Sequence, residues 1–165
     1  MNVHSVTGGY MDQFPAQSSE RARRILVIDD DDETRAGLVA TLRLGGYEVA
    51  EAWGAVQGMR LVLAYRPDVV VLDLVLPDGH GIEVGRAMRA IVTTSRTCVV
   101  AVTASGTSVG LVEPSSFGAE AILLKPVAAD DLLAAVGNCF DDAPSRASLN
   151  VPNCESPSPA REPTT

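Results

Sequence analysis

The sequence is short of positive charge, and this shortage excludes one broad class of function. Its 165 residues carry 13 Lys and Arg against 21 Asp and Glu, a formal net charge of −8 at pH 7. A surface that binds nucleic acid neutralises a row of phosphates with basic side chains, and so acidic a chain offers few of them. We therefore expect no direct contact with DNA or RNA.

The chain also lacks long apolar runs and a secretory leader. No stretch is long enough to cross a bilayer, and residues 1–20 have no basic start followed by an apolar segment. Only three cysteines occur, Cys98, Cys139 and Cys154, without the spacing of a metal site or a CxxC pair. These absences predict a cytoplasmic protein with no membrane contact, in which the cysteines are free thiols.

One domain of ordinary size, flanked by two polar segments, fits the length and the composition. With 46% hydrophobic residues the chain has enough apolar surface for one packed core. Residues 1–22 mix Gly, Pro, Gln and Ser, and residues 141–165 hold five prolines among Ser, Asn and Glu. We predict a disordered leader, a domain over residues 23–140 and a disordered tail.

Short apolar runs alternate along this domain with segments of helical periodicity. The runs predict strands at residues 24–29, 47–50, 69–73, 98–102 and 121–124. The periodic segments predict helices at residues 34–44, 55–65, 82–92 and 130–140, and a short or irregular helix at 106–118. The alternation predicts an α/β fold with a doubly wound, five-stranded parallel sheet of the flavodoxin-like (βα)5 type, in the order 2-1-3-4-5.

The same spacing predicts which side chains of the helices face the core. They are the large apolar residues at helical intervals, namely Leu38, Leu42, Val56, Met59, Leu63, Met88, Ile91, Val92, Leu132, Leu133, Val136 and Phe140. Trp53 is expected to pack with the second helix rather than to anchor a partner. His80 is expected to be a solvated loop side chain rather than a ligand.

Charged or polar side chains follow four of the five predicted strands: Asp29 and Asp30, Asp73, Thr103, and Lys125. The carboxyl ends of parallel strands meet at one edge of the sheet, and strands 1 and 3 lie side by side in the predicted order. We therefore expect Asp29, Asp30 and Asp73 to lie together. The acids at 31–33 suit the positive N-terminal end of the helix that follows them.

Three neighbouring carboxylates require a cation, because like charges so close together raise one another's pKa. Mg²⁺ suits them, since it takes one or two carboxylates, keeps several waters and bridges to phosphate oxygens. Lys125 is the only lysine in the chain, and its ammonium can pair with carboxylates and then with a phosphoryl oxygen. Thr103 offers a hydroxyl to another phosphoryl oxygen. These parts indicate phosphoryl transfer, with one carboxylate as the nucleophile.

These motifs resemble the receiver domain of bacterial two-component response regulators. The resemblance rests on residues 25–30 with their paired Asp, on Asp73 with Pro77 and Gly81, on Val102-Thr103-Ala104 and on Lys125-Pro126, and it covers about residues 24–140. It implies that Asp73 accepts a phosphoryl group from a phosphohistidine of a sensor histidine kinase or a histidine phosphotransfer protein. It also implies that Asp29, Asp30, Asp73 and the backbone carbonyl of Val75 hold Mg²⁺. Thr103 and Lys125 would bind the phosphoryl group, and the Lys125-Pro126 peptide would be cis.

The sequence departs from the family pattern in the residues that report on phosphorylation. Ile122 stands where the family usually has an aromatic switch residue, and the weak segment 106–118 falls where the family forms its output face. The positions that tune hydrolysis in this family are Val75 and Ser105. Because an apolar Val75 cannot orient an attacking water, we predict a persistent aspartyl phosphate.

The tail over residues 141–165 lacks apolar periodicity, so no output domain is expected there. The expectation is a stand-alone receiver that signals through protein contacts or relays its phosphoryl group onward. It is expected to be a phospho-acceptor that assists its own phosphorylation and autodephosphorylation, and not an enzyme.

Two other functions stay open. A pseudo-receiver that binds partners without phosphate would keep the same fold, and Ile122 favours it. A haloacid-dehalogenase-like phosphatase matches at residues 30–34, but Asp130 and Asp131 begin a helix where that family needs acids at a strand end, and Asp73 is left without a task. A flavodoxin that binds flavin is the weakest candidate, because acids follow the first strand where a phosphate-binding loop is needed.

Overall fold

The computed structural model describes residues 22–104 and 113–141. The predicted leader and tail therefore lie outside the described residues, except for Ala22 and Asp141 at their borders. Ser105 also lies outside them. Among the helices that the structure describes, none is both long and apolar enough to cross a membrane.

A five-stranded parallel sheet forms the centre of the fold, as predicted. Its strands are β1 (Arg24–Ile28), β2 (Glu48–Ala52), β3 (Val69–Asp73), β6 (Cys98–Thr103) and β7 (Ala119–Leu124). Their order is β2-β1-β3-β6-β7, and every neighbouring pair is parallel. This is the predicted order 2-1-3-4-5, with β1 and β3 adjacent. A small antiparallel hairpin of β4 (Val75–Leu76) and β5 (Gly79–His80) follows β3 and was not predicted.

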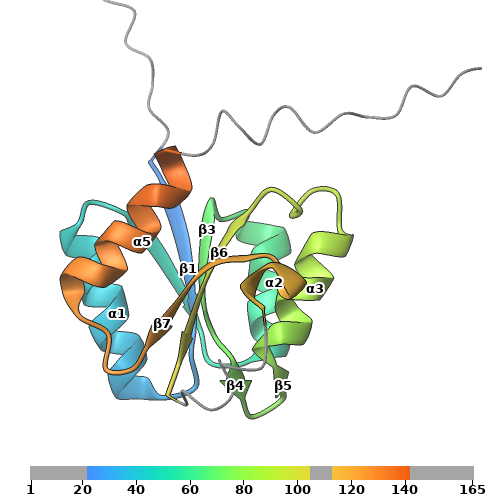
Figure 1. The fold of residues 1–165 in the computed structure, drawn as a ribbon, viewed down its shortest axis with the longest axis horizontal. Coiled ribbons are helices and arrows are strands. Elements are labelled where there is room, and N and C mark those ends of the chain that lie inside the picture. Colours follow the sequence, from blue (N-terminus) through green and yellow to red (C-terminus); the bar gives the residue numbers. More distant parts are fainter. Residues whose placement is uncertain (1–21, 105–112, 142–165) are drawn as a thin grey trace, which may run out of the picture.

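Helices cover both faces of the sheet (Figure 1). They are α1 (Asp32–Leu44), α2 (Ala55–Tyr65), α3 (Gly81–Ala90) and α5 (Ala129–Asp141). The helices α1 and α5 pack on one face, and α2 and α3 pack on the other. Successive β3 residues alternate between the two layers, so that Val69 and Val71 face α1 and α5 while Val70 and Leu72 face α2 and α3. Because β3 is buried on both faces, its sequence is an unbroken apolar run.

The predicted helix over residues 106–118 falls mostly outside the described residues. Its described end forms the single 3-10 turn η1 (Pro114–Phe117), which begins with a proline and ends at Gly118 in the left-handed conformation (φ 76°). Phe117 inserts its ring into the core layer of α2 and α3. Gly85 on α3 permits this approach, since a Cβ there would lie 2.7 Å from the Phe117 carbonyl oxygen.

The prediction of which face α2 buries was wrong for Val56 and Leu63, whereas Met59 packs against the core as predicted. Val56 and Leu63 are exposed, and the buried residues are Ala55, Gly58 and Val62. The helix approaches the sheet through its small residues: a Cβ on Gly58 would lie 2.6 Å from the Ile28 side chain. A pattern of large apolar residues cannot reveal a contact made by glycine and alanine.

Two further packing predictions were also wrong. Trp53 does not pack on α2, because it precedes the helix and is 61% exposed. Val92 is 88% exposed because α3 ends at Ala90, two residues before it. His80 is exposed, as predicted.

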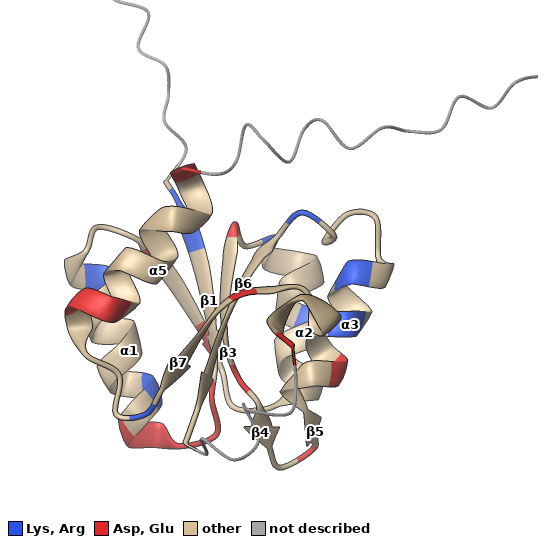
Figure 2. Cartoon of the chain, viewed as in Figure 1, with Lys and Arg blue, Asp and Glu red and all other residues tan. Residues whose placement is uncertain are grey.

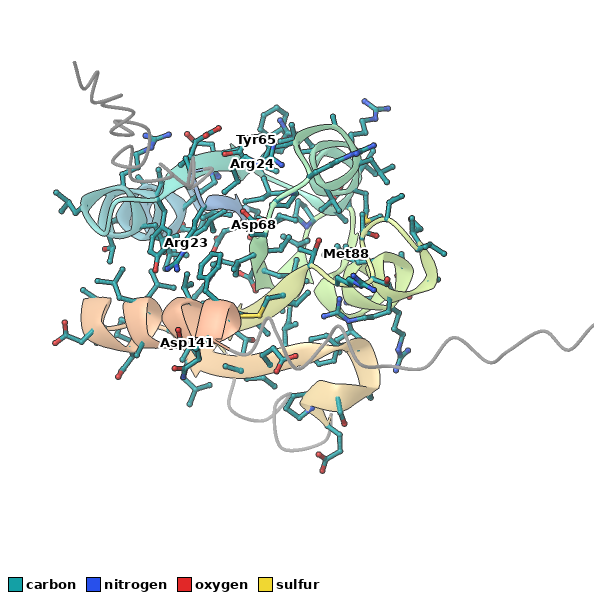
Figure 3. All side chains as sticks on the ribbon, turned by 90° about the horizontal axis from the view of Figure 1, so that it is seen from above. Arg23, Arg24, Tyr65, Asp68, Met88 and Asp141 are labelled. Carbon is teal, nitrogen blue, oxygen red and sulfur yellow. A yellow bond between two sulfur atoms is a disulfide. The ribbon has the colours of Figure 1, made fainter. Side chains whose placement is uncertain are left out.

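The prediction of free thiols was wrong for two of the three cysteines. Cys98 at the start of β6 and Cys139 near the end of α5 form a disulfide, with their Cα atoms 5.9 Å apart (Figure 3). Their separation of 41 residues gave no sign of the pairing, which arises because α5 packs back across β6. Cys154 lies outside the described residues.

Candidate functional site

Three carboxylates meet at the carboxyl edge of the sheet, where the prediction placed them. One oxygen from each of Asp29, Asp30 and Asp73 lies within 4.8 Å of the other two. Asp29 follows β1 and Asp73 ends β3, and the pairing of Ile28 with Leu72 brings the two strand ends level. Asp29 and Asp73 are buried, whereas Asp30 is exposed. Acidic residues thus gather at this edge beside the start of α1 (Figure 2).

Both buried carboxylates are oriented in the same way by the backbone. Oδ1 of Asp29 accepts a hydrogen bond from the N–H of Asp31 at 3.0 Å, and Oδ1 of Asp73 accepts one from the N–H of Val75 at 2.9 Å. In each case the donor lies two residues after the aspartate, in the manner of an Asx turn. The second oxygen, Oδ2, of each carboxylate is turned toward Lys125.

Lys125 bridges the two buried carboxylates. Its Nζ lies 2.7 Å from Oδ2 of Asp29 and 2.5 Å from Oδ2 of Asp73. The residue follows β7, its N–H donates to the Thr103 carbonyl at 2.9 Å, and its peptide bond to Pro126 is cis, as predicted. Lys125 thus follows β7, which is separated from β1, the strand that precedes Asp29, by β3 and β6.

The ion pairs do not fully compensate the buried charge. Burial raises the pKa of Asp29, although the hydrogen bond and the charge of Lys125 act in the opposite direction. Burial also acts to lower the pKa of Lys125, but its hydrogen bonds to Asp29 and Asp73 outweigh burial and leave that pKa raised. The ammonium therefore stays charged, and one positive charge is shared between two carboxylates.

The donor set fits a hard divalent cation. Oδ2 of Asp29 is buried, and the Lys125 ammonium that lies 2.7 Å from it is shared with Asp73. Carboxylate oxygens, two buried and one exposed, are the ligands that Mg²⁺ prefers. The site therefore has three carboxylates and one ammonium, which leaves an excess of negative charge for a cation to neutralise.

Thr103 and Val75 complete the set of predicted site residues. Thr103 ends β6 and is fully buried, and it pairs in register with Leu124, the neighbour of Lys125. Val75 begins β4 with its side chain 60% exposed beside Asp73. Asp130 and Asp131, which a phosphatase would need here, are exposed in the first turn of α5 and do not belong to the carboxylate cluster.

Sequence reasoning missed two residues that support the site. Arg35 on α1 donates to the backbone carbonyl of Asp29 at 2.8 Å and pairs with Asp32 and Glu51, which fixes the segment between β1 and α1. Asp78 reaches from the β4–β5 turn to the first residues of α2. The prediction that the later acids serve the N-terminus of α1 was correct, since Asp31 caps that helix through the N–H of Thr34.

Comparison with known proteins agrees with this geometry. The chain matches the response regulator receiver domain family over residues 25–137. The transcriptional regulatory protein PrrA of Mycobacterium tuberculosis is 36% identical over 113 residues, which cover 68% of this chain and 48% of PrrA. The DNA-binding response regulator MtrA of the same organism is 34% identical over 145 residues, which cover 86% of this chain and 62% of MtrA. The chain thus spans only about half the length of PrrA.

Solved structures show the same fold. A CheY-like response regulator receiver domain protein from Methanospirillum hungatei has a TM-score of 0.70 and 26% identity, over 76% of this chain and 99% of its own. A response regulator receiver domain protein from Clostridium thermocellum has a TM-score of 0.68 and 29% identity, over 74% of this chain and 98% of its own. The family match, the fold and the acidic edge together show that the chain belongs to the response regulator receiver domain family.

Proposed function

We propose that Asp73 accepts a phosphoryl group from the phosphohistidine of a sensor histidine kinase or a histidine phosphotransfer protein, in a reaction that depends on Mg²⁺. Receiver domains act in two-component signalling, and phosphorylation and Mg²⁺ binding are general properties of the family. The observation that supports the proposal most directly is the place of Asp73. Its carboxylate is buried beside Asp29, and its Oδ2 lies 2.5 Å from the Lys125 ammonium.

Asp73 is arranged to act as a nucleophile through Oδ2. Its other oxygen is occupied by the N–H of Val75, which fixes the rotation of the carboxylate. When Oδ2 attacks phosphorus, the bond from phosphorus to the donor's imidazole nitrogen breaks and its electron pair returns to the imidazole. The product is an acyl phosphate on Asp73.

Lys125 and Thr103 are placed to bind the transferred group. As Oδ2 of Asp73 bonds to phosphorus, the ammonium exchanges that oxygen for a phosphoryl oxygen as a point charge. Thr103 ends the strand next to β3 and offers its hydroxyl to a second phosphoryl oxygen. In both roles the side chain would stabilise negative charge that the reaction brings into the site.

Asp29, Asp30 and Asp73 would hold Mg²⁺, with the backbone carbonyl of Val75 as a further ligand. Three carboxylates that share one ammonium, two of them buried, support this assignment. When bound, the ion neutralises the negative charge of the carboxylates and of the incoming phosphoryl group.

On this proposal the chain is a phospho-acceptor and not an enzyme, and it signals by protein contact or by phosphorelay. We place it in the cytoplasm, where kinases that use ATP act. A disulfide such as Cys98–Cys139 is rare in a reducing compartment, and a thiol assay described below tests whether the bridge is present. The stand-alone role and the absence of nucleic-acid contact stay predictions, because the relatives are longer and MtrA is a DNA-binding regulator.

The proposal is tested by the intact mass of the protein after incubation with acetyl phosphate. We expect one phosphoryl adduct on the wild type in the presence of Mg²⁺ and none when the metal is chelated. Asp73→Asn should abolish the adduct, whereas Asp141→Asn, at the far end of α5, should leave it unchanged. An adduct that persists in Asp73→Asn contradicts the assignment of the acceptor.

A phosphate-independent binding module is the second candidate. Two observations favour it: Ile122 replaces the aromatic switch residue and packs against the core layer of α2 and α3, and the described part of the predicted fourth helix is only the turn η1. Absence of any adduct on the wild type, from acetyl phosphate and from a phosphohistidine donor, would favour this candidate over phosphorylation.

A further inference from the structure

The N-terminus of α2 has no cap of its own. The residue before the helix is Gly54, which has no side chain to accept a hydrogen bond, and the first turn contains no acidic residue. The first N–H groups of a helix have no partner within the helix and need an acceptor from elsewhere. For α2 that acceptor comes from a distant part of the chain.

Asp78 accepts hydrogen bonds from two of these N–H groups. Its Oδ1 accepts the N–H of Ala55 at 2.6 Å and its Oδ2 accepts the N–H of Val56 at 3.0 Å. These two hydrogen bonds, from Val56 and Ala55, hold the pKa of Asp78 below its usual value. The carboxylate is therefore charged at neutral pH, and it sits at the positive end of the helix.

Gly54 makes room for this contact. A Cβ at position 54 would lie 2.6 Å from Oδ1 and 2.9 Å from Oδ2 of Asp78. The backbone of Gly54 is extended, with φ −170° and ψ 171°, which other residues adopt as well. The position therefore requires glycine for space beside Asp78 and not for backbone conformation.

Asp78 lies in the turn of the β4–β5 hairpin. The hairpin begins at Val75, two residues after the proposed phospho-acceptor Asp73. Val75 pairs with His80 and Leu76 pairs with Gly79, so that Pro77 and Asp78 form the tip. At the other end of the hairpin, the N–H of Val75 binds the Asp73 carboxylate. A hairpin with two residues in each strand is not stable by itself and needs an external anchor.

We propose that Asp78 is a positioning residue of the metal site: it anchors the β4–β5 hairpin on α2 and so holds the Val75 carbonyl and the Asp73 carboxylate in place for Mg²⁺. The inference rests on the function proposed above. Asp78 does not touch the metal, and it acts through the six-residue segment from Val75 to His80 that it ties to the helix. Removal of the anchor leaves every ligand present but allows the hairpin, and with it the carbonyl, to move.

The test is the affinity for Mg²⁺, measured by isothermal titration calorimetry on the full chain. We expect Asp78→Ala to bind Mg²⁺ about tenfold more weakly than the wild type, the effect usual for residues that orient metal ligands. Asp78→Asn should fall between the two, because an amide offers one acceptor oxygen in place of two. Gly54→Ala should weaken binding as well, because its methyl group displaces the Asp78 carboxylate.

A double-mutant cycle separates positioning from loss of structure. If both residues act through one contact, Gly54→Ala adds little to the effect of Asp78→Ala on Mg²⁺ affinity. Asp131→Ala removes an acid from the first turn of α5 and serves as the control, with affinity unchanged. All titrations are made at a temperature where circular dichroism shows each variant fully folded. Should Asp78→Ala fail to fold, Gly54→Ala alone carries the test.

The role of Asp78 and the proposed Mg²⁺ site can be disproved by different results. Wild-type affinity in the folded Asp78→Ala and Gly54→Ala variants, even with lowered melting temperatures, would show that Asp78 only stabilises the fold and would overturn the inference. Absence of Mg²⁺ binding by the wild type would overturn the proposed metal site itself, and the inference with it.

Discussion

Nζ of Lys125 lies 2.7 Å from Oδ2 of Asp29, the oxygen that otherwise accepts no hydrogen bond of normal geometry within the described residues. This ion pair joins the end of β1 to the residue after β7, and Lys125 contacts Asp73 as well. The ammonium thus occupies oxygens that the proposed function assigns to Mg²⁺ and to phosphorus. Lysine and metal compete in part for the same carboxylates, and this competition has measurable consequences.

Replacement of Lys125 by methionine should therefore affect metal binding and phosphorylation in opposite directions. Lys125→Met frees two buried carboxylates from a nearby positive charge, so Mg²⁺ should bind more tightly in a calorimetric titration. Phosphorylation by acetyl phosphate should slow roughly 100-fold, because one fixed positive charge for the transferred group is lost. Arg60→Met, an exposed substitution on α2, should change neither quantity. Weaker Mg²⁺ binding in Lys125→Met would contradict the competition.

The aspartyl phosphate should be persistent, and Val75 should be the cause. Its side chain stands 60% exposed beside Asp73 and has no polar atom with which to orient water. Val75→Asn supplies a donor and an acceptor that can orient an attacking water, so the phosphate should be lost about tenfold faster. The measurement is the decay of the phosphoryl adduct by intact mass after the donor is removed. Val92→Asn, which is also exposed (88%) but lies on the α3–β6 connection, should decay like the wild type. Rapid decay of the wild type itself would refute the prediction.

The disulfide should be present in protein isolated without reductant. Alkylation in denaturant should then modify one cysteine of the three, and prior reduction should expose all three. Because the bridge closes a segment of 41 residues, reduction should lower the free energy of unfolding by about 4 kcal/mol in the chain-entropy description. Cys139→Ser should show two modified cysteines with or without reductant. Three modified cysteines in the unreduced wild type would contradict the bridge and support the original prediction of free thiols.

Alkaline pH should destabilise the fold through Tyr65. Burial, followed by the hydrogen bond to Glu48 and the charge of Glu48, raises the pKa of Tyr65 to about 12. An unfolded tyrosine has a pKa near 10, so the contribution of Tyr65 is fully present below about pH 10 and is lost as the pH rises toward 12. Urea midpoints measured across this range should fall less steeply for Tyr65→Phe than for the wild type. Parallel curves for the two proteins would show that the phenol contributes nothing to the pH dependence.

The sequence predicted the features that large apolar residues mark along the chain, and it did not predict contacts made by small residues. The strand ends were predictable because β1, β3 and β6 are buried on both faces, which forces apolar runs that stop where Asp29, Asp73 and Thr103 begin the site. The parallel order then placed the carboxylates together. The face of α2 was not predictable, because the contact is made by Gly58 rather than by a large side chain.

Contacts between distant segments that do not follow from the strand order were beyond sequence reasoning. Asp78 looks like an ordinary turn residue, and only the folded chain brings it to the N-terminus of α2, 23 residues earlier. Cys98 and Cys139 likewise meet only because α5 returns across β6. Patterns along the chain report local periodicity and burial, whereas a cap or a bridge supplied from far away leaves no periodic signal.

Arg89 provides the last prediction, because it holds three segments together with one guanidinium. Nη1 donates to the carbonyls of Ser95 and Thr97 at 2.9 and 2.7 Å, and Nη2 donates to the carbonyl of Gly118. Arg89→Met keeps the length of the side chain but leaves these partly buried carbonyls without their donor. The free energy of unfolding in urea should fall by about 2 to 4 kcal/mol, since hydrogen bonds from a charged donor contribute about 1.5 to 3 kcal/mol each and only part of this is lost where water replaces the donor.

A matched control for Arg89 lies on the same helix. Arg86 is exposed, and within the described residues it makes one long hydrogen bond, of 3.5 Å from Nε to the Ser116 carbonyl. Arg86→Met should therefore change the free energy of unfolding by less than about 0.5 kcal/mol, as is usual for surface positions. Equal losses in the two variants would mean that helix propensity or charge, rather than the triple contact of Arg89, accounts for the effect. A loss confined to Arg89→Met would establish that α3, the segment before β6 and the turn after η1 are held by one side chain.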